Sequence, residues 1–224
     1  MDFETARFNM VEQQIRPWNV LNQDVLDLLF TVRRENYVPT AIQNMAFTDM
    51  DLPIVIDGKT TGQTMFAPKM EARFIQALAV KRHESVVEIG AGSGHMAALL
   101  ANRANKVLSY EINPEIAKFA QANLKRANVA NVQIRNADAA STAEQAQFKG
   151  ADVIVLSGSV EFIPDWLLQS LNVGGRLSAI VGQSPVMTAE IHTRVSQNDF
   201  KTEVLFETDT PALQTFAKKT RFTF

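Results

Sequence analysis

The stretch SVVEIGAGSGH, residues 85–95, decides how this chain folds. Its first five residues form a short β-prone run, three glycines follow at alternate positions, and the helix-forming run HMAALLANRA begins at His95. Glycine tolerates positive φ and has no Cβ that would keep a ligand from the backbone. A strand, a glycine turn and a helix in this order predict the first βα turn of a parallel sheet, where ligands commonly bind.

On both sides of this turn, strand-like and helix-like segments alternate, and the strands are apolar along most of their length. This pattern predicts an α/β fold with a doubly wound, mostly parallel sheet covered by helices on both faces. The tail runs TEVLFETD and LQTFAKKTRFTF are expected to form antiparallel edge strands, and His192 is expected on a polar tail helix. Further strands are expected at 106–111, 131–138, 151–158 and 174–182, and helices at 68–78, 114–128, 142–148 and 163–171.

The N-terminal part differs from this pattern. Apolar residues recur at helical spacing within residues 1–50, with prolines as punctuation. We therefore expect a single domain, 1–224, in which residues 1–65 form a helical cover and a loop on the substrate side. Residues 66–224 are expected to form the cofactor-binding α/β core.

Composition narrows the class of protein. Hydrophobic residues make up 46% of the chain, charged residues 21%, and the formal net charge is -2, so the basic excess typical of nucleic-acid binding is absent. The chain has no cysteine and its three histidines are dispersed, so we expect no metal site. The charged start MDFETARFNMVEQQ lacks a signal-peptide core. We expect a cytoplasmic protein, monomeric or homodimeric, that binds neither membrane nor nucleic acid.

The glycine spacing separates two classes of cofactor. Dinucleotide sites use G-x-G-x-x-G, whereas here the third glycine, Gly94, comes one residue early. Glu88, two residues before Gly90, would repel a pyrophosphate. A cationic or zwitterionic ligand without phosphate, such as S-adenosylmethionine, suits the turn better than NAD does.

Polar groups at successive strand ends support a cofactor site. Glu111 closes the second strand 21 residues after Gly90, close to the spacing of about 20 residues at which a carboxylate binds ribose hydroxyls. Asp138 follows the third strand, where an adenine amino group would lie, and Ser157 ends the fourth. A ligand-free tight turn and solvated carboxylates are the alternatives. The predicted cofactor-binding residues are Glu88, Gly90, Gly92, Ser93, Gly94, His95, Glu111, Ile112, Asp138, Ala139 and Ser157.

Several stretches resemble the protein-L-isoaspartate O-methyltransferases, a family of class I S-adenosylmethionine-dependent methyltransferases. VVEIGAGSGH is similar to the family's V-L-E-I-G-T-G-S-G-Y, and MVEQQI, RENYVP, AFTD and LPI follow in the family's order. The resemblance implies a Rossmann-like fold with a mostly parallel seven-stranded sheet and an N-terminal helical extension. It also implies methylation of the carboxylate of L-isoaspartyl residues in damaged proteins, a repair activity.

The chain departs from the family between Ile54 and Pro68. Where the family has G-Q-T-I-S-x-P, with a serine that helps to hold the isoaspartyl carboxylate, this chain has GQTMFAP, which puts Phe66 at the serine position. Thr64, or Thr60 or Thr61, could supply the missing hydroxyl. Thr64 and Phe66 are therefore the candidate catalytic positions. Phe66 could equally be a core residue.

The expected chemistry needs no general base, because a carboxylate with a pKa of about 4 is already ionised at neutral pH. Orientation and exclusion of water can then lower the barrier. Lys69 and Arg73, one helical turn apart, could attract a carboxylate or form a solvated helix face. The alternatives to the isoaspartyl activity are a methyltransferase with a different small-molecule or protein acceptor, and a cofactor-binding module without catalysis.

Overall fold

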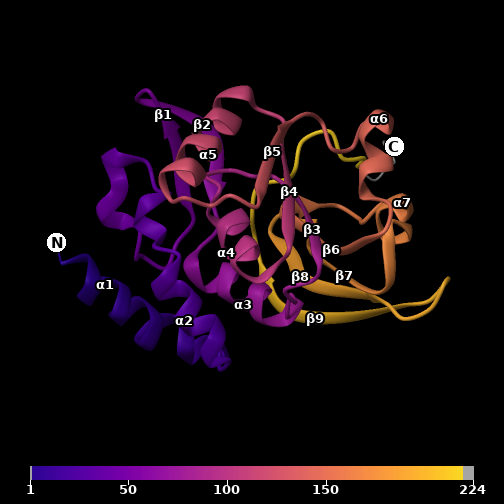
Figure 1. Cartoon of the computed structure of the whole chain (residues 1–224), viewed down its shortest axis with the longest axis horizontal. Coiled ribbons are helices and arrows are strands. Elements are labelled where there is room, and N and C mark those ends of the chain that lie inside the picture. The colour runs from indigo at the N-terminus through magenta and orange to yellow at the C-terminus, as the bar shows by residue number, and fades with distance from the viewer. Residues whose placement is uncertain (1, 219–224) are drawn as a thin grey trace.

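The structure, a computed structural model, describes residues 2–218, and these contain a seven-stranded sheet (Figure 1). The strand order is β5-β4-β3-β6-β7-β8-β9. The five strands β5 to β7 are parallel, whereas β8 and β9 add to one edge in antiparallel fashion. The strands are β3 (Ser85–Ile89), β4 (Lys106–Glu111), β5 (Val132–Asn136), β6 (Ala151–Val160), β7 (Leu171–Gln183), β8 (Val186–Arg194) and β9 (Phe200–Thr208).

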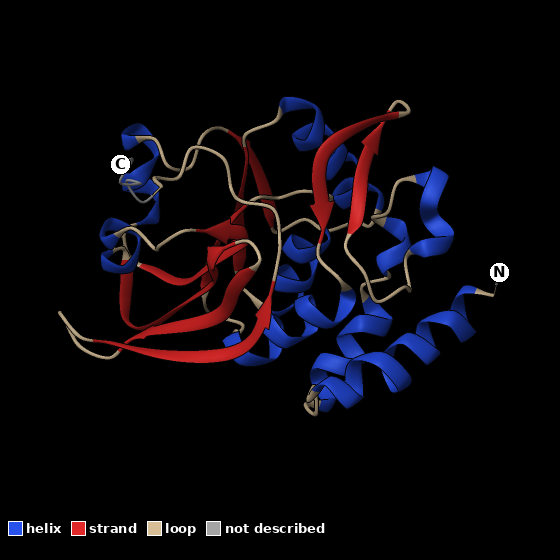
Figure 2. Ribbon diagram, turned by 180° about the vertical axis from the view of Figure 1, so that it is seen from behind, coloured by secondary structure: helices blue, strands red, loops and turns tan. Residues whose placement is uncertain are grey.

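Helices cover both faces of this sheet (Figures 1 and 2). The helices α3, α4 and α5 lie on one face, with the N-terminal helices beyond them, and α6, η5 and α7 lie on the other. The core helices are α3 (Pro68–Leu78), α4 (His95–Arg103), α5 (Pro114–Arg126), α6 (Thr142–Gln145), η5 (Ala146–Phe148) and α7 (Asp165–Gln169). The N-terminal ones are α1 (Phe3–Asn9), η1 (Met10–Ile15), η2 (Arg16–Trp18), α2 (Gln23–Thr31), η3 (Arg34–Asn36) and η4 (Thr40–Met45).

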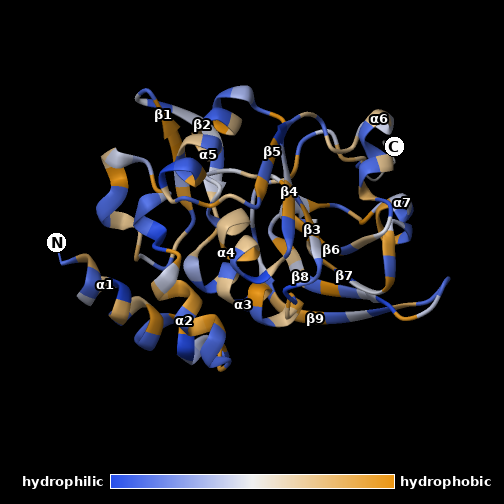
Figure 3. Cartoon of the chain, viewed as in Figure 1, coloured by the Kyte–Doolittle hydropathy of each residue, from blue (hydrophilic) through white to orange (hydrophobic). Residues whose placement is uncertain are grey.

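Alternate residues of the central strands explain the two covered faces. In β3, Val86 packs into the core under α3 and α4, whereas Val87 and Ile89 pack into the opposite core with Phe148 and Leu167. Side chains alternate between the faces of a strand, so a strand buried on both sides is apolar along most of its length. Hydrophobic and hydrophilic residues alternate along α2, which has only one face to bury (Figure 3). The predicted doubly wound α/β fold is confirmed.

Two local expectations about secondary structure were wrong. The segment expected as a loop before Phe66 is a β-hairpin of β1 (Leu52–Ile56) and β2 (Lys59–Met65), joined at Asp57 and Gly58, which both have positive φ. That geometry suits a two-residue hairpin turn. His192 lies on β8 and not on a helix. The signal for β8 was the alternation of its buried residues, Met187, Ala189 and Ile191.

The second tail run does not continue the sheet. From Leu213 to Lys218 the chain forms no strand, and Thr215 has a φ of 68°, which interrupts an extended backbone. Residues 219–224 of the predicted edge strand lie outside the described residues.

Between residues 2 and 218, no helix combines the length and apolarity needed to span a bilayer.

Candidate functional site

The glycine turn between β3 and α4 lies where the order of the parallel strands reverses. β3 has β4 on one side and β6 on the other, and ligands bind at such points beyond the carboxyl ends of the strands. Gly90 has a φ of 96°, and a Cβ there would lie 3.1 Å from the Ser157 carbonyl oxygen and 3.2 Å from a methyl of Leu213. A Cβ on Gly94 would lie 3.3 Å from the Ala120 carbonyl oxygen. The glycines therefore permit both the backbone path and the close packing.

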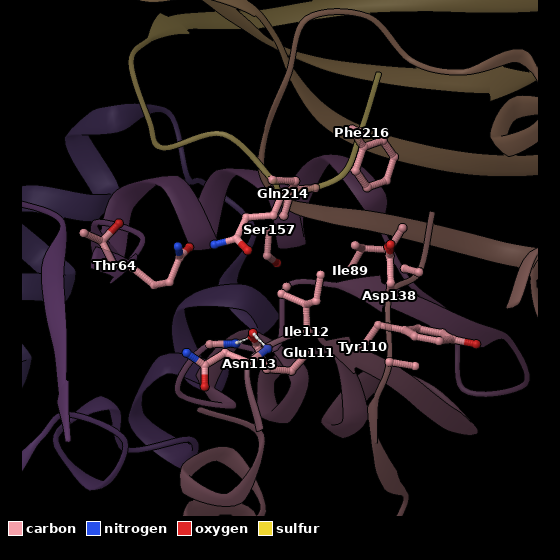
Figure 4. Close-up of a pocket in the computed structure, with 16 residues that line it drawn as sticks. Thr64, Ile89, Tyr110, Glu111, Ile112, Asn113, Asp138, Ser157, Gln214 and Phe216 are labelled. Carbon is pink, nitrogen blue, oxygen red and sulfur yellow. Dashed lines mark hydrogen bonds between the residues drawn. The ribbon is translucent and has the colours of Figure 1, made fainter. Parts of the chain in front are cut away.

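A pocket opens above this turn (Figure 4). The open space inside it, including its mouth, is about 630 Å³. Thr64 lies at one end of the pocket in Figure 4, Asp138 and Phe216 lie at the other, and Glu111 lies between them. Eight of the predicted residues line this pocket: Thr64, Gly90, Gly92, Glu111, Ile112, Asp138, Ala139 and Ser157.

The other predicted residues do not line it. Ser93 and Phe66 line a smaller adjoining cavity, which Thr64 and Ser157 also border. Glu88 and His95 are buried, and neither they nor Gly94 line either cavity. The lining residues that the sequence did not predict are Gln63, Ile89, Tyr110, Asn113, Ala137, Leu213, Gln214 and Phe216. Position beside a strand end could have indicated Ile89, Tyr110, Asn113 and Ala137, but the tail residues gave no such signal.

Glu111 is held in place by the backbone. Its carboxylate accepts a hydrogen bond from the Gly92 N–H and another from the Asn113 N–H, each 3.0 Å long. Burial raises the pKa of this carboxyl group, and the backbone donors oppose the rise. Because a carboxylate offers about four acceptor positions, Glu111 keeps capacity for ligand hydroxyl groups.

Glu88 lies beneath the turn and is fully buried. The hydroxyl groups of Ser109 and Ser157 donate hydrogen bonds to it, at 2.6 and 2.9 Å. Burial raises the pKa of the Glu88 carboxyl to about 8 despite these two hydrogen bonds, and the negative charges of Glu71 and Glu111 add to the rise.

Arg34 joins the N-terminal part of the chain to the end of β2 and to α3. Its guanidinium pairs with Glu71, donates to the Phe66 carbonyl at 2.6 Å and donates to the Ala46 carbonyl at 3.0 Å. His95 Nδ1 lies 2.8 Å from the same Glu71 carboxylate. Burial opposes ionisation of Glu71, but Arg34 and His95 hold the pKa of its carboxyl below the usual range. This network fixes the backbone at the end of β2.

The Phe66 ring belongs to the core. It is buried and lies 6.2 Å, centroid to centroid, from the ring of Phe74. Thr64, two residues earlier, is partly exposed and borders both cavities. At this end of β2 the residue with a hydroxyl group that lines the pocket is therefore Thr64.

Lys69 and Arg73 stand away from the pocket. Lys69 pairs with Asp49 at 2.8 Å and lies over the Trp18 ring, 4.0 Å from its centroid. Arg73 donates to the Asn19 carbonyl at 3.1 Å. These contacts favour the alternative of a helix face with its own partners over a role in attracting a carboxylate.

The segment after β9, residues 209–218, crosses the pocket and is called the tail segment below. Ser159 N–H donates to the Pro211 carbonyl at 3.0 Å, and Leu213 N–H donates back to the Ser159 carbonyl at 2.8 Å. Further on, the Thr215 hydroxyl donates to the Asp138 carboxylate at 2.7 Å. The tail segment is thereby tied to β6 and to the loop after β5.

Within residues 2–218, no group of three or more acidic, histidine or cysteine side chains could hold a metal ion.

Several known proteins are similar to this chain in sequence. The family model described as protein-L-isoaspartate(D-aspartate) O-methyltransferase matches residues 6–209. A protein-L-isoaspartate O-methyltransferase of Methanoculleus marisnigri is 38% identical over 176 residues, 79% of this chain and 77% of that protein. One of Syntrophus aciditrophicus is 34% identical over 206 residues, 91% of each chain.

A solved structure agrees in fold. The crystal structure of a protein described as a putative protein-L-isoaspartate O-methyltransferase from Plasmodium falciparum, in complex with S-adenosyl-L-homocysteine, superimposes with a TM-score of 0.78. It is 18% identical and the match covers 93% of this chain and 98% of that one. The family match, with the fold and the pocket at its switch point, shows that this chain belongs to the protein-L-isoaspartate(D-aspartate) O-methyltransferase family and is an S-adenosylmethionine-dependent methyltransferase.

Proposed function

We propose that this protein methylates the side-chain carboxylate of L-isoaspartyl residues in damaged proteins. The observation that supports this acceptor is the place of Thr64, a residue with a hydroxyl group at the end of β2, which lines the same pocket as the glycine turn and Ser157. Thr64 would then perform the task of the family's serine from two residues earlier in the chain.

The residues of the pocket fit the cofactor. Gly90 and Gly92 line the pocket and carry no Cβ that would keep a ligand from the backbone, and Glu111 keeps free acceptor positions for ribose hydroxyl groups. Asp138, at the far end of the pocket from Thr64, would accept from an adenine amino group (Figure 4). We propose that Gly92, Ile112, Ala139 and Ser157 also contact the cofactor, and that Glu88, Ser93, Gly94 and His95 support the turn from behind.

When bound, S-adenosylmethionine supplies an electrophilic methyl group and becomes a neutral thioether on transfer. The protein must hold an already ionised carboxylate in line with this group and exclude water. Neutral donors are available for that purpose in the side chains of Gln63, Thr64 and Gln214. We further propose that residues 1–65 cover the acceptor side and that the protein works in the cytoplasm, as a monomer or homodimer.

A different acceptor is the second candidate. None of the described residues that line the two cavities is a lysine or an arginine, so an anionic acceptor would meet no cationic side chain there. This observation favours an uncharged or smaller methyl acceptor.

Methyl transfer to a defined peptide separates the two candidates. Radiolabel from S-adenosylmethionine should enter an L-isoaspartyl peptide as a base-labile methyl ester and should not enter the same peptide with aspartate. Tight cofactor binding without transfer to the isoaspartyl peptide would contradict the proposed acceptor and support the second candidate.

Thr64→Val should lower kcat/KM for the isoaspartyl peptide by about 10- to 100-fold, since one hydrogen bond to a charged group contributes about 1.5–3 kcal/mol. Valine keeps the β-branch that suits a strand and removes only the hydroxyl. The affinity for S-adenosylhomocysteine should change little. Thr60→Val, at the exposed end of the same strand, is the matched control. Equal activity of T64V and T60V would show that the Thr64 hydroxyl does not hold the acceptor.

A further inference from the structure

The pocket and the cavity beside it have an unusual balance of charge. Their lining includes the carboxylates of Glu71, Glu111 and Asp138, and Glu88 lies directly beneath the turn. Among the described lining residues there is no lysine, arginine or histidine. An electrostatic field of one sign therefore acts on any ligand bound there.

The carboxylates near the turn differ in how their charge is compensated. Glu71 is paired with Arg34 and His95, and Glu111 accepts two backbone hydrogen bonds. Glu88 has only the hydroxyl groups of Ser109 and Ser157 among its described partners. Of these carboxylates, Glu88 therefore gains most from a positive charge placed in the pocket.

The surroundings of Glu88 keep it protonated until such a charge arrives. Its hydrogen-bond partners are Ser109 on β4 and Ser157 on β6. The negative charges of Glu111 on β4 and Glu71 on α3 act on it electrostatically. The nearby cation, Arg34, is already bound to Glu71, and so is the imidazole ring of His95. Burial raises the pKa of Glu88 to about 8, so at neutral pH most molecules carry the neutral acid.

We propose that Glu88 is a selectivity residue that ionises when the sulfonium cofactor binds and stays neutral with the demethylated product, so that the site prefers methyl donor over product. The proposal rests on the proposed cofactor pocket. The donor carries a net positive charge because of its sulfonium, whereas the thioether product carries no net charge. The proton leaves Glu88 for solvent when the donor binds and returns once the sulfonium has become a thioether.

The pH dependence follows from the direction of the shift. At pH values below the pKa of Glu88, which is about 8, donor binding must release a proton from Glu88. The affinity for the donor should therefore increase with pH. Product binding releases no proton from Glu88, so its affinity should stay nearly flat. The preference for donor over product should therefore rise by about tenfold between roughly pH 6 and pH 7.5.

Calorimetry of both ligands with the full-length protein tests this directly. Titrations in phosphate and in Tris, whose ionisation enthalpies differ, give the number of protons released on binding. We expect about one proton for S-adenosylmethionine near pH 7 and close to none for S-adenosylhomocysteine. In Glu88→Gln the difference in proton release should disappear, and the preference for donor should fall about tenfold and become independent of pH.

Glu115→Gln, at an exposed glutamate in the first turn of α5, is the matched control and should behave as the wild type. Equal proton release for the two ligands in the wild-type protein would overturn the role of Glu88 while leaving the cofactor assignment intact. An unchanged donor preference in E88Q would do the same. Failure of either ligand to bind the wild type would instead overturn the proposed pocket and this inference together.

Discussion

Glu111→Ala is expected to weaken the binding of S-adenosylmethionine and of S-adenosylhomocysteine equally, by about 100-fold, which corresponds to about 2.8 kcal/mol. Two effects act together. The variant loses the acceptors proposed for the ribose hydroxyl groups, and it also frees the Gly92 and Asn113 N–H groups that Glu111 holds. Hydrogen bonds to charged groups contribute about 1.5–3 kcal/mol each. Calorimetric titration of each ligand measures the loss.

The exposed Glu115→Ala provides the comparison, because it removes a carboxylate from the nearby first turn of α5 without touching the pocket. Both ligands contain the same ribose, so a loss confined to one of them would contradict the proposed role of Glu111. A decrease below about threefold for both would contradict it as well, because that is less than one such hydrogen bond contributes.

Arg34→Met should lower the free energy of unfolding by about 3–5 kcal/mol, the usual cost of leaving one partner of a buried ion pair alone. Arg34 is 1% exposed and Glu71 is 3% exposed, so water cannot replace the lost contact. The carbonyl groups of Ala46 and Phe66 also lose their donor. For a chain of this size, the melting temperature should fall by about 10 °C, as measured by calorimetry or circular dichroism.

The adjacent Arg33 supplies the matched control, because its side chain is 54% exposed and lies 3.3 Å from the exposed Glu4. Arg33→Met should change the melting temperature little, since exposed ion pairs contribute about 0–1 kcal/mol. The double variant R34M/E71Q should recover part of the stability, because it removes the stranded charge. If R34M and R33M melted alike, the buried network would not support the fold.

The residues that the sequence predicts best are those whose position follows from the order of the strands. Gly90, Gly92, Glu111 and Asp138 line one pocket because each follows, or ends, a parallel strand, and parallel strands end at one edge. Position along the chain was enough to bring them together. The place of Thr64, which we propose supplies the hydroxyl, followed less directly, since it depends on the pairing of the hairpin strands.

Local sequence patterns could not predict the contacts between distant parts of the chain. Leu213 packs against Gly90 although more than a hundred residues separate them, and neither sequence neighbourhood indicates the other. Arg34 lies in the RENYVP stretch that resembles the family, yet a sequence pattern gives no sign that this arginine is buried. Its partner Glu71 lies on a helix 37 positions later, so only the packing of the cover on α3 reveals the pair.

The tail segment forms part of the wall of the pocket, so its opening can influence the rate at which ligands exchange. The two backbone hydrogen bonds to Ser159 and the Thr215–Asp138 bond hold this segment beside the pocket, so opening these bonds would widen the way out for a ligand. Openings of this kind are local unfolding events with their own rate, independent of the chemistry below them. Product release is a frequent bottleneck in enzymes. If it needs this opening, we expect turnover to respond to solvent viscosity more than to the nucleophilicity of the acceptor.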